Sequence, residues 1–276
     1  MGEVRVLGNQ DVPAVRRLLD LRPVDNVLIA SRVQAHGVER SHLGNDLLGY
    51  WEDGELTSFL SDGYNLHPIN AGPAALAAFA RRLEHRRCAS IVGVRDEAMG
   101  LYEALAATNY TQWGAPREIR DHQRVMVIDG PPLVQPDPAV QVATTRLLDS
   151  YHAASVAMYT EEVGVAPLDS RGAYRTHVAS LLMKGHAFCV QRAGQVVFKA
   201  DIVATAGTLC QVGGVWLAPA LRGHGWSKPL MAAVVARCQE RYPVVTLYVN
   251  RHNIPAVKCY LVVGFRQVSE CATILY

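Results

Sequence analysis

The strongest constraint on the fold is a glycine-rich segment that lies between an apolar run and a helical pattern. The apolar run covers 212–217, the sequence Leu-Arg-Gly-His-Gly-Trp-Ser follows at 221–227, and the helical pattern covers 228–241. A helix that begins at such a turn exposes unpaired backbone N–H groups and carries partial positive charge at its N-terminus. Gly223 and Gly225 place no Cβ between those N–H groups and an anion. The segment therefore predicts a strand, an anion-binding loop and a helix.

The glycine loop alone does not separate a phosphate site from a purely structural turn. It lacks the Gly-Lys-Ser/Thr ending of a P-loop. It also lacks the Gly-x-Gly-x-x-Gly spacing of a dinucleotide site, and no early βαβ unit surrounds it. The residues that follow the loop therefore decide between the two interpretations.

A second motif follows the loop and ends near the last residue of the chain. The pattern at 244–249 indicates a buried strand, and the pattern at 253–263 indicates a helix. Asn253 suits the N-cap of that helix, and Gly264 suits its C-terminal end. A last strand is expected from Phe265 to about residue 275.

The two motifs together resemble those of the GNAT superfamily of N-acetyltransferases, over residues 212–276. The phosphate loop of that family has the form Arg/Gln-x-x-Gly-x-Gly/Ala, and this chain has Arg222, Gly225 and Ser227 there, with serine as a mild departure. The later family motif, Asn-x-x-Ala-x-x-x-Tyr-x-x-x-Gly-Phe, is matched by Asn253, Ala256, Tyr260, Gly264 and Phe265. The resemblance implies an α/β (α+β) fold, with a mixed central sheet flanked by helices and strands that splay at the cofactor site.

The resemblance implies that acetyl-CoA (coenzyme A) is the cofactor. Its pantetheine arm would bond the strand backbone at Val215, Trp216 and Leu217. Its pyrophosphate would lie on the N–H groups of a loop formed by Arg222, Gly223, His224, Gly225, Trp226 and Ser227. The side chains of Arg222, His224 and Lys228 either add positive charge there or point to solvent. Asn253 would bond the cofactor, cap its helix, or do both.

Tyr260 occupies the position of the general acid in the family, which protonates the sulfur of the leaving CoA. A phenol titrates near ~10, so it keeps its proton at neutral pH. The alternative is a core tyrosine on an amphipathic helix. Its position between Asn253 and Gly264 favours the catalytic role.

The general base is less well defined by the sequence. Many family members place an acid on the strand before the phosphate loop, but this chain has Cys210, Gln211, Gly213 and Gly214 there. Glu161 and Glu162 lie between the first two helices of the C-terminal half, where the family forms its acceptor wall. Each is a candidate base, and a solvated loop is the alternative.

Another acid, Asp201, lies two residues from Lys199 on one strand face, which favours a structural ion pair. The histidines and cysteines are dispersed, and no cluster has metal-ligand spacing, so we expect no metal site.

A proline-rich segment divides the chain into two domains in this interpretation. Residues 129–138 hold four of the fourteen prolines and predict a stiff, extended linker. The catalytic GNAT domain is then expected at 139–276. The part at 1–128 repeats the same order of strands and helices, and Asp53-Gly54, between the strand patterns at 46–51 and 56–61, predicts a hairpin turn.

The N-terminal part lacks the cofactor loop. The helix at 97–107 contains Ala98-x-x-x-Tyr102, the spacing of the later motif, but Asn70-Ala71-Gly72-Pro73 stands where the phosphate loop is expected. Pro73 has no N–H to offer a phosphate. We therefore interpret 1–128 as a degenerate GNAT-like domain, with an unrelated α/β domain as the alternative. This layout resembles that of tandem-GNAT proteins of actinobacteria.

Composition narrows the classes of partner. The chain has 276 residues, 50% of them apolar, and a formal net charge of +2, which does not favour a nucleic-acid partner. No apolar run reaches the ~18 residues of a membrane span. The six cysteines include no Cys-x-x-Cys pair and are expected to be free thiols, so we expect a cytoplasmic protein, as a monomer or a homodimer.

The sequence thus predicts an acyltransferase that moves an acetyl group from acetyl-CoA directly to a primary amine. The acceptor would be a small molecule, an amino acid or a peptide amine. The missing strand carboxylate leaves one alternative open, a non-catalytic CoA-binding or protein-interaction module with a GNAT fold.

Overall fold

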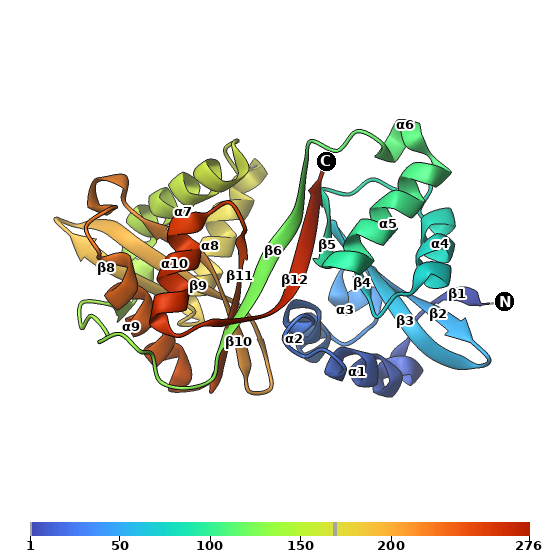
Figure 1. Cartoon of the computed structure of the whole chain (residues 1–276), viewed down its shortest axis with the longest axis horizontal. Coiled ribbons are helices and arrows are strands. Elements are labelled where there is room, and N and C mark those ends of the chain that lie inside the picture. Colours follow the sequence, from blue (N-terminus) through green and yellow to red (C-terminus); the bar gives the residue numbers. More distant parts are fainter. Residues whose placement is uncertain (1, 168–169) are drawn as a thin grey trace. The chain divides into compact units, whose positions relative to one another are not determined.

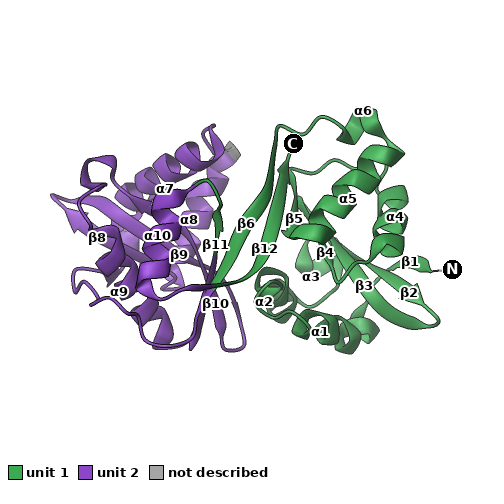
Figure 2. Cartoon of the chain, in the orientation of Figure 1, with its two compact units in different colours: residues 1–126, 248–252, 267–276 green, residues 127–247, 253–266 purple. Residues whose placement is uncertain are grey.

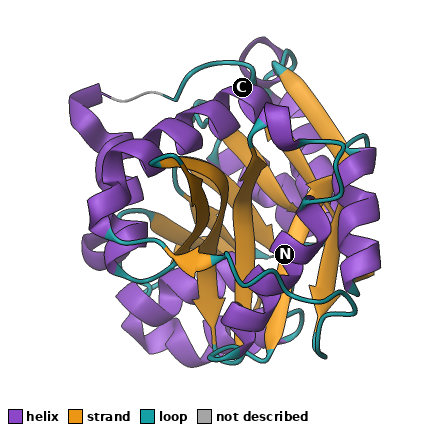
Figure 3. Cartoon of the chain, turned by 90° about the vertical axis from the view of Figure 1, so that its left-hand side faces the viewer, coloured by secondary structure: helices purple, strands orange, loops and turns teal. Residues whose placement is uncertain are grey.

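The computed structural model describes residues 2–167 and 170–276 (Figure 1). The chain forms two compact units, which Figure 2 shows in separate colours. Unit 1 comprises residues 1–126, 248–252 and 267–276, and unit 2 comprises 127–247 and 253–266. Both units combine strands with flanking helices (Figure 3).

Unit 1 is built on a mixed sheet with the strand order β1-β2-β3-β4-β5-β12-β6. Its strands are β1 (Glu3–Val6), β2 (Asp46–Glu52), β3 (Glu55–Asp62), β4 (Asn65–Ile69), β5 (Ser90–Val94), β6 (Glu118–Ile128) and β12 (Arg266–Leu275). Its helices are α1 (Val12–Asp20), α2 (Val27–His36), α3 (Arg40–Leu43), α4 (Pro73–Arg82), α5 (Arg95–Thr108) and α6 (Tyr110–Trp113). The expected hairpin at Asp53 and Gly54 is confirmed, because both residues have positive φ and join β2 to β3.

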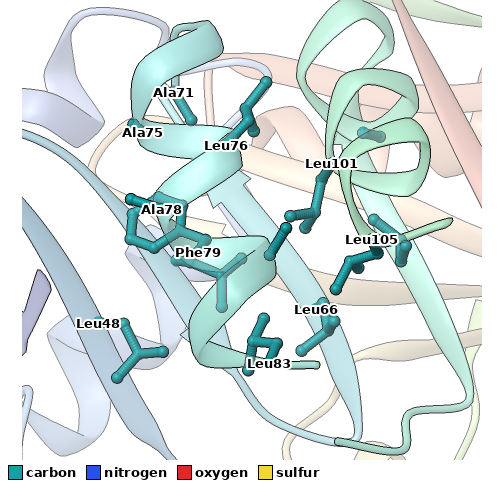
Figure 4. Packing of buried hydrophobic residues seen from close by; sticks show 14 of the residues in the cluster. Leu48, Leu66, Ala71, Ala75, Leu76, Ala78, Phe79, Leu83, Leu101 and Leu105 are labelled. Atoms are coloured by element: carbon teal, nitrogen blue, oxygen red, sulfur yellow. The ribbon is translucent and has the colours of Figure 1, made fainter. Parts of the chain in front are cut away.

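One apolar core of unit 1 lies between its helices α4 and α5 and the sheet (Figure 4), and another lies under α1 and α2. Phe79 of α4 and Leu101 and Leu105 of α5 are fully buried. They pack with Leu66 of β4 and Ile91 of β5 in one apolar cluster. These two helices therefore hold the region where β4 and β5 lie side by side.

The last strand of the chain belongs to unit 1. β12 pairs antiparallel with β5, from Cys271 opposite Val94 to Leu275 opposite Ser90. Its Ala272 and Ile274 are fully buried in the α4–α5 core. The expected domains 1–128 and 139–276 stay a prediction, and the compact units differ from them by placing residues 267–276 with the N-terminal part.

Unit 2 contains a sheet with the strand order β11-β10-β9-β8-β7. Its strands are β7 (Gln141–Val142), β8 (Ala187–Arg192), β9 (Gln195–Ala206), β10 (Leu209–Leu217) and β11 (Val244–Asn250). Its helices are α7 (Leu148–Val163), α8 (Ala173–Met183), α9 (Ser227–Gln239) and α10 (Ile254–Val263). The mixed α/β architecture predicted from the sequence is thereby confirmed.

Two parallel strands of unit 2 part from each other halfway along their length. β10 and β11 pair only from Leu209 opposite Val244 to Gln211 opposite Thr246. Among the described residues, β10 then continues to Leu217 without a parallel partner on that side. The backbone of residues 212–217 is therefore unpaired along one edge, which is the splayed arrangement that the resemblance implies.

The proline-rich segment at 129–138 is bound to unit 2 by several hydrogen bonds. Leu133 N–H donates to the carbonyl of Val263 at the end of α10, over 2.8 Å. Asp137 N–H donates to Pro229 O in α9, over 3.0 Å. The segment is extended, as its prolines predict, and it is fixed along α9 and α10.

Candidate functional site

The loop between β10 and α9 leaves four backbone N–H groups free. The N–H groups of residues 223–226 make no backbone hydrogen bond within the described part of the chain. Gly223 and Gly225 have φ values of +80° and +82°, and a Cβ at either position would meet nothing within 4 Å. α9 follows with 13 residues, which is long enough to add its dipole. The sequence of the loop thus forms an open cradle of donors that fits a phosphate.

Arg222 lies at the start of the loop and is already paired. Its Nε donates to Leu217 O over 2.8 Å, and its Nη2 donates to Oε2 of Glu161 over 2.7 Å. Both side chains of the ion pair are nearly half exposed, at 46% and 43%. The pair is therefore screened by solvent and contributes little stability. It links the phosphate loop to the C-terminal end of α7.

The other side chains of the loop differ in their contacts. His224 is exposed. The ring of Trp226 lies 4.7 Å from the guanidinium carbon of Arg192, at the end of β8. Arg192 therefore adds a cation beside the loop, in addition to Arg222.

A bulge in β10 determines how Val215, Trp216 and Leu217 are presented. The register between β9 and β10 shifts between Gly213 and Trp216, and Gly214 has a φ of +56°. A Cβ on Gly214 would lie 2.4 Å from Oδ2 of Asp201, so no other residue fits there without rearrangement. Lys199 Nζ donates to Gly214 O over 2.9 Å and holds the bulge in place.

The bulge rests on a buried polar network. Lys199 is fully buried and forms an ion pair with Asp201, with 2.5 Å between Nζ and Oδ2. The hydroxyl of Tyr151 on α7 donates to Oδ1 of Asp201 over 2.5 Å. The prediction of a structural Lys–Asp pair is confirmed. Removing one partner would leave a buried charge uncompensated, so the pair fixes the geometry of β9 and β10.

Tyr260 lies on α10 and is only 8% exposed. Its ring packs against that of Phe265, with 5.7 Å between the centroids. Burial raises the pKa of Tyr260 above its usual value, and the nearby Cys259 and Glu162 raise it further. The phenol therefore holds its proton at every pH near neutrality.

α10 is placed beside the loop by its two ends. The side chain of Asn253 accepts a hydrogen bond from Ala256 N–H over 3.2 Å, so it caps the helix as predicted. Gly264 ends the helix in the left-handed region.

The residue before Tyr260 links α10 to α9. Burial raises the pKa of the Cys259 thiol, and a hydrogen bond with the Ser227 side chain partly offsets this. Tyr260 therefore comes directly after Cys259, which contacts Ser227 at the start of α9.

Glu161 and Glu162 lie at the end of α7 but in different surroundings. Glu161 accepts hydrogen bonds from Trp216 Nε1, over 3.0 Å, and from Arg222. Burial alone would raise the pKa of Glu161, but these two hydrogen bonds outweigh it and the pKa is lowered. Glu162 contributes negative charge that raises the pKa of both Tyr260 and Tyr174. Glu162 is therefore the acid whose charge reaches Tyr260.

Sequence reasoning missed three features of this region. Arg192 and Tyr151 had no motif to mark them, because each acts through a neighbour from a distant part of the chain. The pairing of Arg222 with Glu161 was also missed, although both residues were named as site candidates. Opposite charges in two candidate sites were the one available signal.

Other classes of site find no support in the described residues. No group of three or more His, Cys, Asp or Glu side chains within 2–167 and 170–276 is arranged to hold a metal ion. All six cysteines are free. Among the described helices, none is long and apolar enough to cross a membrane.

Two family models match the chain. The model described as "Acetyltransferase (GNAT) family" matches residues 150–265, which contain the loop, Glu161, Glu162 and Tyr260. The model described as "Domain of unknown function (DUF4081)" matches residues 45–151. No curated protein matches the chain in sequence.

Solved structures share the fold along almost the whole chain. A GCN5-related N-acetyltransferase from Sphaerobacter thermophilus has 15% identity and a TM-score of 0.61, covering 99% of this chain and 95% of its own. A GNAT-family acetyltransferase from Colwellia psychrerythraea has 12% identity and a TM-score of 0.58, covering 99% of both chains. A tandem GNAT protein from the clavulanic acid biosynthesis pathway has 15% identity and a TM-score of 0.54, covering 100% and 98%.

These matches agree with the loop, the bulge and the capped α10 helix of unit 2. Residues 150–265 match the GNAT acetyltransferase family, and along almost its whole length the chain has the fold of the solved tandem GNAT protein.

Proposed function

We propose that the protein transfers the acetyl group of acetyl-CoA directly to a primary amine, in unit 2. The observation that carries this proposal is a buried, protonated Tyr260 within the electrostatic reach of Glu162, on a helix whose Cys259 bonds Ser227, the residue that follows the open N–H cradle at 223–226. An acid, a base and an anion cradle in one region are what acyl transfer to an amine requires.

The residues of unit 2 fit acetyl-CoA. The free N–H groups of 223–226 would hold its pyrophosphate, with Arg222 and Arg192 supplying positive charge. The exposed edge of β10 at Val215–Leu217 would bond its pantetheine arm. When bound, acetyl-CoA supplies an acyl thioester that an amine can attack.

Glu162 is the proposed general base. An ammonium group must lose a proton before its nitrogen becomes nucleophilic, and a carboxylate accepts that proton directly or through a water. Glu161 is less suited to this role, because Trp216 and Arg222 already hold its carboxylate. We assign Glu161 to positioning Arg222 and Trp216.

Tyr260 is the proposed general acid. Its hydroxyl makes no hydrogen bond with any side chain or backbone group in the described residues, so it is available to a ligand. Its raised pKa keeps the phenol in the protonated form, which is the form that can donate to the leaving thiolate. The proton then passes to the sulfur, which prevents the reverse reaction.

The test is CoA release measured with a thiol reagent, using acetyl-CoA and a panel of small amines, amino acids and peptides. At least one amine should give turnover that depends on both substrates, and mass spectrometry should find an N-acetyl product. Binding of acetyl-CoA without turnover on any amine would favour the non-catalytic alternative. Acetylation of a hydroxyl and not of an amine would contradict the proposed acceptor class.

A further inference from the structure

Unit 1 contains a cavity that the acetyl transfer reaction does not use. Its volume is about 950 Å³, and all the residues that line it belong to unit 1. It lies where β4 and β5 part, because these parallel strands pair only at Asn65–Leu66 with Ser90–Ile91. The carboxyl ends of parallel strands that diverge are a common place for ligands, and this volume suits a small organic molecule.

The lining of the cavity is strongly acidic. Asp25, Asp96, Glu97 and Glu103 contribute carboxylates, and Arg22 is the one cation among the lining residues that the structure describes. Asp96 is exposed and pairs with Arg95. Neither Asp25 nor Glu103 forms an ion pair with any described residue, although the Ser269 hydroxyl donates to Asp25. Negative charge is therefore left uncompensated around the cavity.

The carboxylate of Glu97 is buried, and one of its two oxygens lacks a hydrogen-bond partner among the described residues. The residue is 6% exposed, and its Oε1 lies 2.7 Å from Arg22 Nη1. Its Oε2 is buried and has no hydrogen-bond partner among the described residues. Burial raises the pKa of Glu97, and Arg22 and the backbone of Asn70 and Ala71 only partly offset this. A buried carboxylate oxygen without a donor is costly, so this oxygen marks a place for a donor from outside the chain.

The same arrangement disfavours an anion in this cavity. Glu97 lies by the backbone of Asn70 and Ala71, just before α4, so the chain places its own carboxylate where unit 2 leaves free N–H groups. Pro73 at the start of α4 has no N–H to donate. A metal ion is also disfavoured, because no described group of three acids is close enough together to hold one.

Apolar groups complete the lining. Leu76 of α4, Val94 of β5 and Ala104 of α5 face the cavity, and Figure 4 shows Leu76 on the helix that packs against α5. A ligand with a cationic head and a hydrocarbon body would satisfy both parts of this surface. We propose that unit 1 binds a small organic cation, a primary amine or a guanidine, whose N–H groups donate to Oε2 of Glu97.

The test measures binding of organic cations to the full chain by calorimetry and thermal shift. The probes are cadaverine, agmatine and phenethylamine, with 1,5-pentanediol and glutarate as neutral and anionic matches of cadaverine. At least one cation should bind and raise the melting temperature, while the diol and glutarate should not. Glu97→Gln should weaken that binding about tenfold or more, because a charged hydrogen bond is lost.

Two further variants separate this site from the amine acceptor site of unit 2. Glu103→Lys changes an exposed residue at the cavity and should also weaken binding, without loss of folding. Glu162→Gln in unit 2 should leave the affinity for the organic cation unchanged. The proposal is overturned if no cation binds at about 5 mM, if Glu97→Gln and Glu103→Lys both leave affinity intact, or if only Glu162→Gln reduces it. Equal binding of glutarate would also overturn it.

Discussion

At the scale of single residues, the site depends on the surroundings that distinguish chemically similar groups. Glu161 and Glu162 are adjacent in sequence, yet Arg222 and Trp216 hold one, while the charge of the other reaches Tyr260. The sequence identified Arg222 and Tyr260 from motif spacing, and the other three from the places that the family resemblance gives them. It could not separate the two acids, because their difference arises from contacts with β10 and α10, far along the chain.

Replacing Tyr260 with phenylalanine should remove the general acid and keep the packing of the ring against Phe265. We expect kcat to fall about 100-fold or more, the usual effect of losing a proton donor. Affinity for acetyl-CoA, measured by calorimetry, should stay within about twofold. An unchanged kcat with every accepted amine would show that Tyr260 is only a core residue.

The two glutamates should respond differently to replacement by glutamine. Glu162→Gln should lower kcat by about 100-fold, since the base is lost. Glu161→Gln should leave Arg222 without its counter-charge, so acetyl-CoA should bind a few-fold more tightly, in keeping with a surface ion pair. Steady-state kinetics and calorimetry on both variants check this. The reverse pattern would exchange the roles that we assign to these residues.

At the scale of elements, the sequence predicted the parts with strong local signals and missed those that depend on tertiary packing. The Asp53-Gly54 hairpin and the Asn253 cap were both predicted from local chemistry and are confirmed. The helix α2 and the strand β4 were not predicted. β4 is short and contains Pro68 and the buried His67, which are unusual in a central strand. The segment is a strand because it pairs with β3 on one side and with β5 on the other.

The phosphate loop should not tolerate a side chain at Gly225. Gly225→Ala places a Cβ in the donor cradle and strains a position with a φ of +82°, so acetyl-CoA affinity should fall about tenfold. Gly207→Ala is the matched control, because it also has positive φ and open space but lies at the other end of β10. Calorimetry should show weakened binding only for Gly225→Ala. Equal loss in both variants would indicate general strain.

The buried His67 of β4 should make the stability of unit 1 depend on pH. Burial lowers its pKa to about 4, with a hydrogen bond to the backbone of Asn65 opposing the shift and the charge of Arg32 adding to it within that value. In the unfolded chain this histidine binds a proton near pH 6.5, whereas in the folded protein it stays neutral until about pH 4. The free energy of unfolding therefore falls as the pH is lowered from 6.5 to 4, by up to about 3 kcal/mol.

His67→Gln should reduce that loss, because glutamine does not titrate. Urea unfolding at pH 7 and pH 4.5 measures the difference between the two proteins. The same pH dependence in both would show that other groups, such as the carboxylates, control acid stability.

At the scale of the whole molecule, the chain contains two units with related layouts and different chemistry. Unit 2 has free N–H groups before α9, whereas unit 1 begins α4 with Pro73 and places Glu97 nearby. The sequence predicted the contrast between the glycine loop and Pro73, but not the position of Glu97. It could not predict that residues 267–276 belong to unit 1, because strand order is decided by packing and not by position in the chain.

Acetyl-CoA should therefore bind once per chain. Calorimetry should give a stoichiometry near one, and a concentration of 100 times Kd should stabilise the folded state by about 2.7 kcal/mol. At the same concentration, the tenfold weaker binding of Gly225→Ala should reduce this stabilisation to about 1.4 kcal/mol, while Pro73→Ala in unit 1 should not alter it. A stoichiometry of two would show that unit 1 also binds the cofactor.

The strand β12 has a consequence for how the protein is made. Unit 1 begins to emerge from the ribosome first, but its core needs Ala272 and Ile274 from the far end of the chain. During synthesis, β5 therefore presents an unpaired edge until residues 267–276 are translated, and such an edge invites wrong pairing between nascent chains. We expect chains shortened by these ten residues to aggregate, even though every residue of the proposed acetyl-transfer site is present.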